Sequence, residues 1–247
     1  MNAGGTGDGR SFRWTPIDRD RLRVEQADGP TSARPEADLA VEQAWAAIRQ
    51  SNPRSFNGPI LAFESFDPEG PTIRVRRDEY RRYAVQPGVP TGVVLLGVSA
   101  VLTTRDPAGR PLVLLGRRNA STRVYRGMWE LGPSGGVAPP PGDRPADVAY
   151  LRGALLEEIR EEIGGVVAEA VRLDAAPVGL LHDPAASSVD VVFRARLPGP
   201  PAIKPPTPAS WEYDELRWLP ADEPGALDRL GPVAPPTRTL WAAIFGA

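Results

Sequence analysis

The sequence predicts an α+β fold, because three stretches show strand patterns and one shows a helix pattern. Residues 93–102 are apolar and rich in β-branched side chains, as expected of a buried strand. Residues 111–118 follow an Asp-Pro-Ala-Gly turn and return as its hairpin partner. Residues 188–197 alternate apolar and polar side chains like a half-buried strand, whereas residues 146–163 place apolar side chains at helical intervals.

An α+β addition is predicted ahead of these elements. Residues 36–50 carry apolar side chains at helical spacing, and the Asn-Pro pair that follows ends the helix. Trp45 on this helix is expected to be a packing residue. The expected strands of this part are residues 12–14, 22–24, 60–66 and 72–76.

The chain is therefore predicted to have three parts. Residues 1–10 are glycine-rich and polar, and we expect a disordered tail there. Residues 11–90 form the N-terminal addition, which ends in the turn sequence Pro-Gly-Val-Pro. Residues 91–247 form the main domain, and a helix at residues 238–245 is expected to close the chain.

Composition limits the functions that are open to the chain. With 247 residues, 41% of them hydrophobic, it can build a sizeable core. Its formal net charge of -2 argues against binding to nucleic-acid polymers or anionic membranes. Cysteine is absent, which excludes disulfides and thiol chemistry. No stretch has the pattern of a signal peptide or the roughly 20 apolar residues of a membrane span, so we expect a soluble cytoplasmic protein.

Acidic side chains crowd into the end of the predicted helix. Glu157, Glu158, Glu161 and Glu162 fall within six residues, and the last three share one helical face through i, i+3 and i+4 spacing. Like charges so placed repel by a few tenths of a kcal/mol per pair, so we expect a cation against them. Oxygen ligands favour Mg²⁺, with Mn²⁺ as a substitute. A solvated helix face is the alternative interpretation.

A glycine turn, a loop and an acidic helix closed by glycine resemble the Nudix box. The run Glu158-Ile-Arg-Glu161-Glu162-Ile-Gly164 matches the second half of that motif, and Gly136 matches its opening glycine. The resemblance implies a Nudix α/β/α sandwich with a mixed β-sheet. It also implies that Glu158, Glu161 and Glu162 bind metal together with the Gly136 carbonyl, and that these glutamates are the catalytic residues.

Two departures from the family pattern affect this site. Glu157 stands where the family has an arginine that braces the catalytic glutamates. Its charge either strengthens cation binding or displaces Glu158, so it is an accessory candidate. The loop between Gly136 and Glu158 is longer than the pattern, and Asp143 within it is the nearest candidate for the family's first glutamate.

Further site residues are implied at two places. Arg117 and Arg118 end the returning strand where family members often place phosphate-binding arginines, and solvation of a strand end is the alternative. Glu212 and Glu215 occupy a late acidic stretch that can supply a fourth metal ligand or a general base.

The reaction that the resemblance implies is metal-dependent hydrolysis of the diphosphate bond in a nucleoside diphosphate linked to another moiety. An Asn-Gly-Pro hairpin combined with the Ser-Gly-Gly turn resembles a branch that cleaves UDP-sugars. ADP-ribose, dinucleotides and oxidised nucleoside triphosphates are rival substrates. A catalytically impaired Nudix module that senses a nucleotide or a protein is the alternative function. Because Nudix proteins often dimerise, a homodimer is a further expectation.

Overall fold

The computed structural model describes residues 12–17, 21–27, 35–142, 144–198 and 205–246. The expected tail at residues 1–10 and the candidate Asp143 lie outside these ranges. Within them, twelve strands form one sheet. The strands are β1 (Arg13–Pro16), β2 (Arg23–Gln26), β3 (Pro59–Asp67), β4 (Thr72–Glu79), β5 (Leu95–Arg105), β6 (Pro111–Arg118), β7 (Trp129–Leu131), β8 (Ser134–Gly136), β9 (Arg172–Leu173), β10 (Gly179–Asp183), β11 (Ser188–Arg196) and β12 (Tyr213–Pro220).

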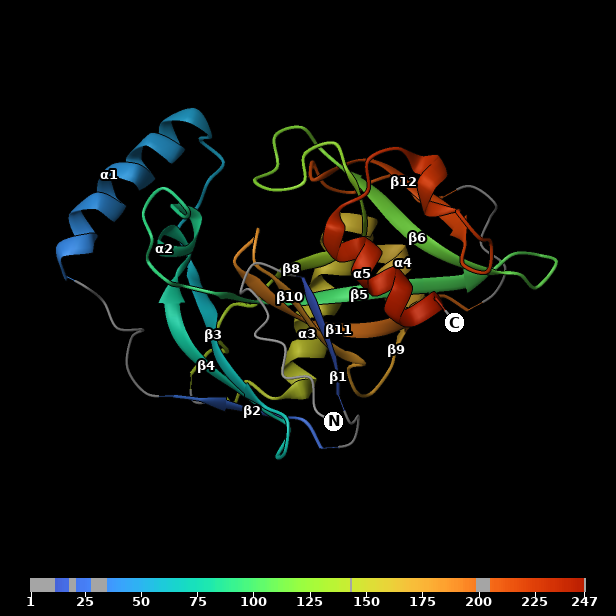
Figure 1. Cartoon of the computed structure of the whole chain (residues 1–247), viewed down its shortest axis with the longest axis horizontal. Coiled ribbons are helices and arrows are strands. Elements are labelled where there is room, and N and C mark those ends of the chain that lie inside the picture. Colours follow the sequence, from blue (N-terminus) through green and yellow to red (C-terminus); the bar gives the residue numbers. More distant parts are fainter. Residues whose placement is uncertain (1–11, 18–20, 28–34, 143, 199–204, 247) are drawn as a thin grey trace, which may run out of the picture.

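The sheet is mixed, as predicted. Its main path runs β1-β10-β11-β5-β3-β4-β2 (Figure 1). Strands β5 and β11 are parallel over nine residue pairs, and β5 pairs antiparallel with β6, β8 and β3. Nearly every residue of β5 is buried, because both faces of this central strand are covered. This burial explains why its sequence is a continuous apolar run.

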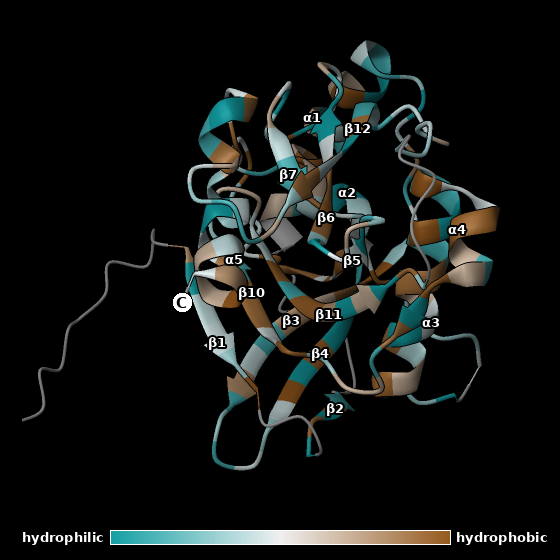
Figure 2. Ribbon diagram, turned by 90° about the vertical axis from the view of Figure 1, so that its right-hand side faces the viewer, coloured by the Kyte–Doolittle hydropathy of each residue, from teal (hydrophilic) through white to brown (hydrophobic). Residues whose placement is uncertain are grey.

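Helices cover both faces of this sheet, which confirms the predicted sandwich. Figure 2 shows α3 and α4 on one side of the central strands and α5 on the other. No helix in the described ranges is long and apolar enough to cross a membrane, and the cytoplasmic location stays a prediction. The helices are α1 (Pro35–Ser51), α2 (Tyr80–Ala84), α3 (Val148–Glu158), the π-helix η1 (Ile159–Ile163), α4 (Gly165–Ala170), the 3₁₀-helix η2 (Leu227–Leu230) and α5 (Pro235–Phe245).

The alternation of β5 builds a core on each face. Leu96 and Val98 pack in the cluster that contains Leu155 of α3, and all three side chains are fully buried. Val101, on the opposite face, packs in the cluster that contains Leu240 of α5. The side chains of one strand thus fix a helix on each side of the sheet.

The acidic helix differs from the prediction at both ends. It begins at Val148, because the Asp147 carboxylate caps it by accepting from the Tyr150 N–H at 2.8 Å. Its last turn is π-helical, since the Gly164 N–H donates to the Ile159 carbonyl, five residues back, at 3.0 Å. Gly164 then ends the helix with a φ of 116°, a conformation that favours glycine. The glutamates at 161 and 162 therefore leave the helix axis in directions that ideal α spacing does not give.

The N-terminal addition joins the sheet along both of its sides. Strand β1 pairs with β10, and β3 is bonded to the centre through Leu61, whose N–H donates to the Val137 carbonyl at 2.7 Å. Ile73 of β4 lies in the same buried cluster as the central strands. Trp45 is buried, as expected, with its ring edge-on to Tyr80. The boundary at residue 90 stays a prediction, but the packing is continuous across it.

Candidate active site

A cavity of about 410 Å³ collects the acidic helix, the glycine strand and side chains from the N-terminal addition. Glu158 and Glu161 line it from the helix, and Gly136 lines it from β8. Register places Gly136 opposite Gly97 of the central strand β5. The cavity is also lined by Tyr80, Tyr83, Arg118, Arg123, Tyr125, Glu130, Asp183, Asp190, Trp211 and Glu212.

Glu158 is held against the glycine strand. A Cβ atom added to Gly135 would overlap the Glu158 carboxyl group, so only glycine leaves room for this contact. Burial, followed by the charges of Glu161 and Glu212, raises the pKa of Glu158 to about 7. The carboxyl therefore titrates near neutral pH, as expected for a group that exchanges protons.

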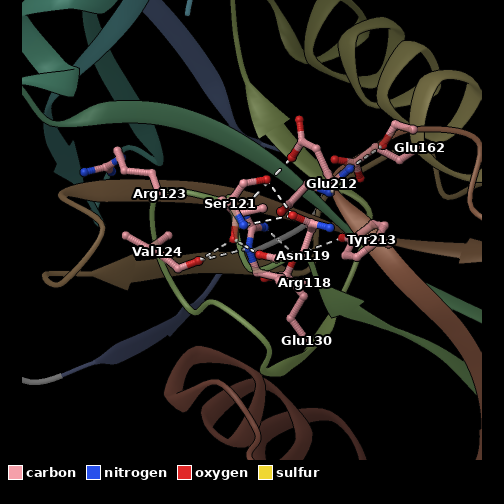
Figure 3. Close-up of polar contacts among 12 residues, drawn as sticks. Arg118, Asn119, Ser121, Arg123, Val124, Glu130, Glu162, Glu212 and Tyr213 are labelled. Carbon is pink, nitrogen blue, oxygen red and sulfur yellow. Dashed lines mark hydrogen bonds and ion pairs between the residues drawn. The ribbon is translucent and has the colours of Figure 1, made fainter. Parts of the chain in front are cut away.

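Glu162 lies beneath the cavity and is 2% exposed. Its carboxyl accepts from the Ser134 N–H at 3.3 Å and is hydrogen-bonded to Glu212 (Figure 3). Burial and the neighbouring Glu212, Glu158 and Glu130 raise the pKa of Glu162 well above its usual range, whereas Arg118 lowers it.

Arg118 supplies positive charge to these carboxylates. Its guanidinium donates to Glu130 at 2.6 Å and lies 4.0 Å from Glu212 (Figure 3). The Tyr213 hydroxyl donates to the same Glu130 oxygen at 2.8 Å. The Tyr213 ring fits there because Gly116 has no side chain, and an added Cβ would overlap it. The buried Arg118, Glu130 and Tyr213 side chains form a connected polar cluster, of which Arg118 and Glu130 line the cavity.

Four predicted site residues do not line the cavity: Glu162, which lies beneath it, and Arg117, Glu215 and Glu157. Arg117 and Glu215 pair with each other at 3.7 Å on neighbouring strands, with 43% and 37% of their side chains exposed. Successive residues of a strand face opposite sides, so Arg117 and Arg118 diverge. Glu157 is 63% exposed and pairs with Arg160 at 2.6 Å. Its charge faces solvent and is offset locally.

Several lining residues escaped the sequence analysis. Tyr125 has a φ of 55°, and its hydroxyl lies 2.8 Å from both oxygens of Asp183. A positive φ at a bulky residue is strained and clusters at functional sites. Glu130 stands between two apolar residues of β7, a pattern that predicts an exposed side chain, but all three residues of this strand are buried. The sole histidine, His182, does not line the cavity, and burial and Arg13 lower its pKa.

Asp190 of β11 provides a test of charge burial in this cavity. Its carboxyl accepts from the Ser99 hydroxyl at 2.7 Å, and burial raises its pKa to about 6. Since that pKa exceeds the unfolded value, the ionised carboxyl costs stability as pH rises through about 6. We expect Asp190→Asn to increase the free energy of unfolding by about 1–3 kcal/mol at pH 8 and by little at pH 4. Urea unfolding at both pH values measures this; exposed Asp222→Asn is the control, and an equal gain at pH 4 would contradict the argument.

The donor chemistry of the cavity fits a hard divalent cation. Glu158 and Glu161 supply carboxylate oxygens, and the mutual rise of carboxyl pKa values marks negative charge that a cation would offset. Within the residues that the structure describes, no three Asp, Glu, His or Cys side chains lie close enough together to hold a metal ion. Glu162 is instead bonded to Glu212 and Ser134.

Comparisons with known proteins place this site in a family context. The sequence model described as NUDIX domain matches residues 95–240. A Nudix hydrolase from M. smegmatis, RenU, is similar at 21% identity, over 60% of this chain and 81% of that chain, with a TM-score of 0.42. A NUDIX hydrolase from Alicyclobacillus acidocaldarius is similar at 19% identity, over 62% of this chain and 92% of that chain, with a TM-score of 0.44. A C. elegans Ap4A hydrolase is similar at 18% identity, over 62% of this chain and 100% of that chain, with a TM-score of 0.37. No curated protein matches the chain.

Proposed function

Because the chain belongs to the Nudix family, we propose that it hydrolyses the diphosphate bond of a nucleoside diphosphate linked to another moiety. The observation that carries the proposal is the cavity in which Glu158 and Glu161 face the Gly135-Gly136 strand. Carboxylates and arginines among the lining residues suit a substrate that carries phosphate and brings a cation.

Mg²⁺ is the proposed metal ion, with Mn²⁺ as a substitute. Glu158, Glu161 and Glu162 would hold it, with the Gly136 carbonyl as a further ligand and Glu212 as an accessory one. When bound, the ion neutralises charge on the diphosphate oxygens and makes water a better nucleophile. A glutamate that is not committed to the metal would take the proton of the attacking water.

The arginines have different roles in this proposal. Arg118 keeps Glu212 and Glu130 in place through its charge, and its side chain is only 12% exposed. Arg123 faces the cavity from the loop after β6 and is oriented by the Ala186 carbonyl, to which it donates at 2.6 Å. We therefore assign phosphate contact to Arg123, and Arg118, which also lines the cavity, stays a candidate for the same contact. Arg117 and Glu215 do not line the cavity, so we assign them no role in it.

The proposed substrate is a small molecule, and neither a nucleic-acid polymer nor a membrane is proposed as a partner. A nucleotide sugar such as a UDP-sugar is one candidate, beside ADP-ribose, dinucleotides and nucleoside triphosphates. Homodimerisation stays a prediction. The alternative is a sensor that binds nucleotide without cleaving it, and the lack of three gathered metal ligands in the described ranges is what favours it.

A hydrolysis screen with and without metal tests the proposal. We expect turnover on one of these substrate classes with Mg²⁺ or Mn²⁺. Excess chelator should reduce it at least about a hundredfold, because several kcal/mol of charge stabilisation is lost, and added Mg²⁺ should restore it. Release of phosphate or nucleoside monophosphate is the measurement. Absence of turnover on every class, by folded protein that binds nucleotide, would favour the sensor.

A further inference from the structure

A second cavity, of about 1050 Å³, adjoins the candidate active site. Tyr80, Arg123 and Trp211 line both cavities, so the two are neighbours that share these side chains as a common boundary. The second is formed largely by the N-terminal addition, from the end of α1 to the start of β3, which lie on the same side of the molecule as α2 (Figure 1). Its size is at the upper end of small-molecule pockets, which are about 300–1,000 Å³.

The two cavities differ in charge. The first contains six carboxylates and two arginines among its lining residues. The second contains Arg54, Arg123 and Arg126, and none of its lining residues is acidic. These charges favour a cation in the first cavity and an anion in the second. A substrate spanning both cavities would place its metal-bound diphosphate at the acidic end and a further anionic group at the arginines.

Exposed aromatic rings give the second cavity its other character. Phe56 is 77% exposed and Trp211 is 42% exposed, which is unusual for side chains of this size. The Phe56 ring lies over Gly58, where a Cβ atom would come within 2.9 Å of it, so glycine allows the ring its position. The Arg54 guanidinium lies 5.9 Å from the centre of the Trp211 ring. Open aromatic faces beside arginine are the surfaces on which planar heterocycles stack.

Arg123 fixes the junction between the cavities. Its guanidinium stacks 4.3 Å from the centre of the Tyr83 ring and donates to the Tyr83 hydroxyl and the Ala186 carbonyl. Tyr80 and Tyr83 both come from the N-terminal addition, so this part of the chain orients an arginine of the main domain. The addition therefore shapes the wall along which a substrate passes from one cavity to the other.

We propose that the second cavity binds the aromatic base of a nucleotide together with a phosphate attached to it, and that the N-terminal addition thereby selects the substrate. Phe56 and Trp211 stack on the base, and Arg54 and Arg126 contact the phosphate. The placement of the reacting bond in the acidic cavity rests on the proposed function. The binding of a nucleotide at Phe56 and Arg54 does not.

Nucleotide binding without metal tests this inference directly. The probes are AMP, GMP, CMP and UMP, with ribose 5-phosphate as the phosphate that lacks a base, measured by calorimetry in chelator. We expect at least one nucleoside monophosphate to bind more tightly than ribose 5-phosphate. Phe56→Ala should weaken its binding about fivefold to a hundredfold, as for loss of one stacking partner, without affecting ribose 5-phosphate. Arg54→Ala should weaken both.

Matched controls come from helix α1. Leu39→Ala removes an apolar side chain that is 68% exposed and Arg49→Ala removes an exposed arginine, and neither residue lines the cavity. On a hydrolysed substrate, Phe56→Ala should raise KM by a similar factor and change kcat less than twofold, whereas both controls should match the wild type.

The outcomes separate this inference from the proposed hydrolysis. Binding that depends on Phe56, without turnover of any substrate, would overturn the hydrolysis and support the inference. Turnover with KM and nucleotide binding unchanged in Phe56→Ala and Arg54→Ala would overturn the inference and leave the hydrolysis intact. Wild-type protein that binds no nucleoside monophosphate would also overturn the inference.

Discussion

Replacing Glu161 with glutamine is expected to lower kcat by about a hundredfold to a thousandfold on whichever substrate the protein hydrolyses. The amide keeps the shape of the side chain but removes a negative charge from the cavity wall, where a preorganised charge typically contributes this much. Glu161 is exposed, so the substitution should leave the free energy of unfolding nearly unchanged. Steady-state kinetics over a Mg²⁺ titration measures both the loss of turnover and any shift in the metal requirement.

Glu157→Gln is the matched control for this prediction. It makes the same chemical change on the same acidic segment, but at a side chain that faces solvent and pairs with Arg160. We expect kcat to stay within twofold of the wild type, because exposed ion pairs contribute about 0–1 kcal/mol and this one does not contact the cavity. Equal losses in both variants would show that the total charge of the helix matters. An active Glu161→Gln would place the metal ligands elsewhere.

The elements of this fold were predictable from sequence where their signal was local. The continuous apolar run of β5 predicts a strand buried on both faces, and the apolar spacing of α3 predicts a helix buried on one face. Both predictions agree with the structure. Strand order is not a local property. The parallel pairing of β5 with β11 and the attachment of β1 to β10 join residues far apart in the chain, so no window of sequence contains them.

The candidate site follows the same division. Glu158, Glu161 and Gly136 were found because the motif that contains them is contiguous or nearly so. Arg117 and Arg118 were indistinguishable in sequence, because the choice between them depends on which face of β6 borders the cavity.

The remaining cavity residues come from separate elements of the fold. Asp183, Asp190 and Tyr125 reach the cavity from β10, β11 and the loop before β7. Phe56 and Trp211 are brought to one cavity only when the N-terminal addition packs beside the main domain.

The position of Glu157 shows how positive charge can reach the buried glutamates without the arginine of the motif. The sequence left open whether a glutamate in place of this arginine strengthens cation binding or displaces Glu158. In the structure the Glu157 carboxylate is turned outward to Arg160, while Arg118 brings positive charge to Glu162 and Glu212 from another strand. The Arg118 guanidinium thus supplies positive charge to the buried glutamates, but from a different element than the family pattern indicates.

Removing the positive charge of Arg118 gives the largest expected change in the free energy of unfolding. Arg118→Met keeps the length of the side chain but leaves Glu130 buried without its ion-pair partner, and breaking a buried pair costs roughly 3–5 kcal/mol. Because Arg118 lowers the pKa values of Glu162 and Glu212, its loss raises them further above their unfolded values. When folding raises the pKa of a carboxyl, the folded protein loses stability as pH rises through that pKa. The destabilisation should therefore be larger at pH 8 than at pH 5.

The neighbouring residue provides the control for this prediction. Arg117→Met removes an arginine that is 43% exposed and lies 3.7 Å from Glu215, so we expect a cost below about 1 kcal/mol at either pH. Urea unfolding in chelator measures both variants without a contribution from metal binding. Equal costs for Arg117→Met and Arg118→Met would mean that the Glu130 cluster is hydrated. The two adjacent arginines therefore test whether the Arg118–Glu130 ion pair at the candidate active site is buried, as its low exposure indicates.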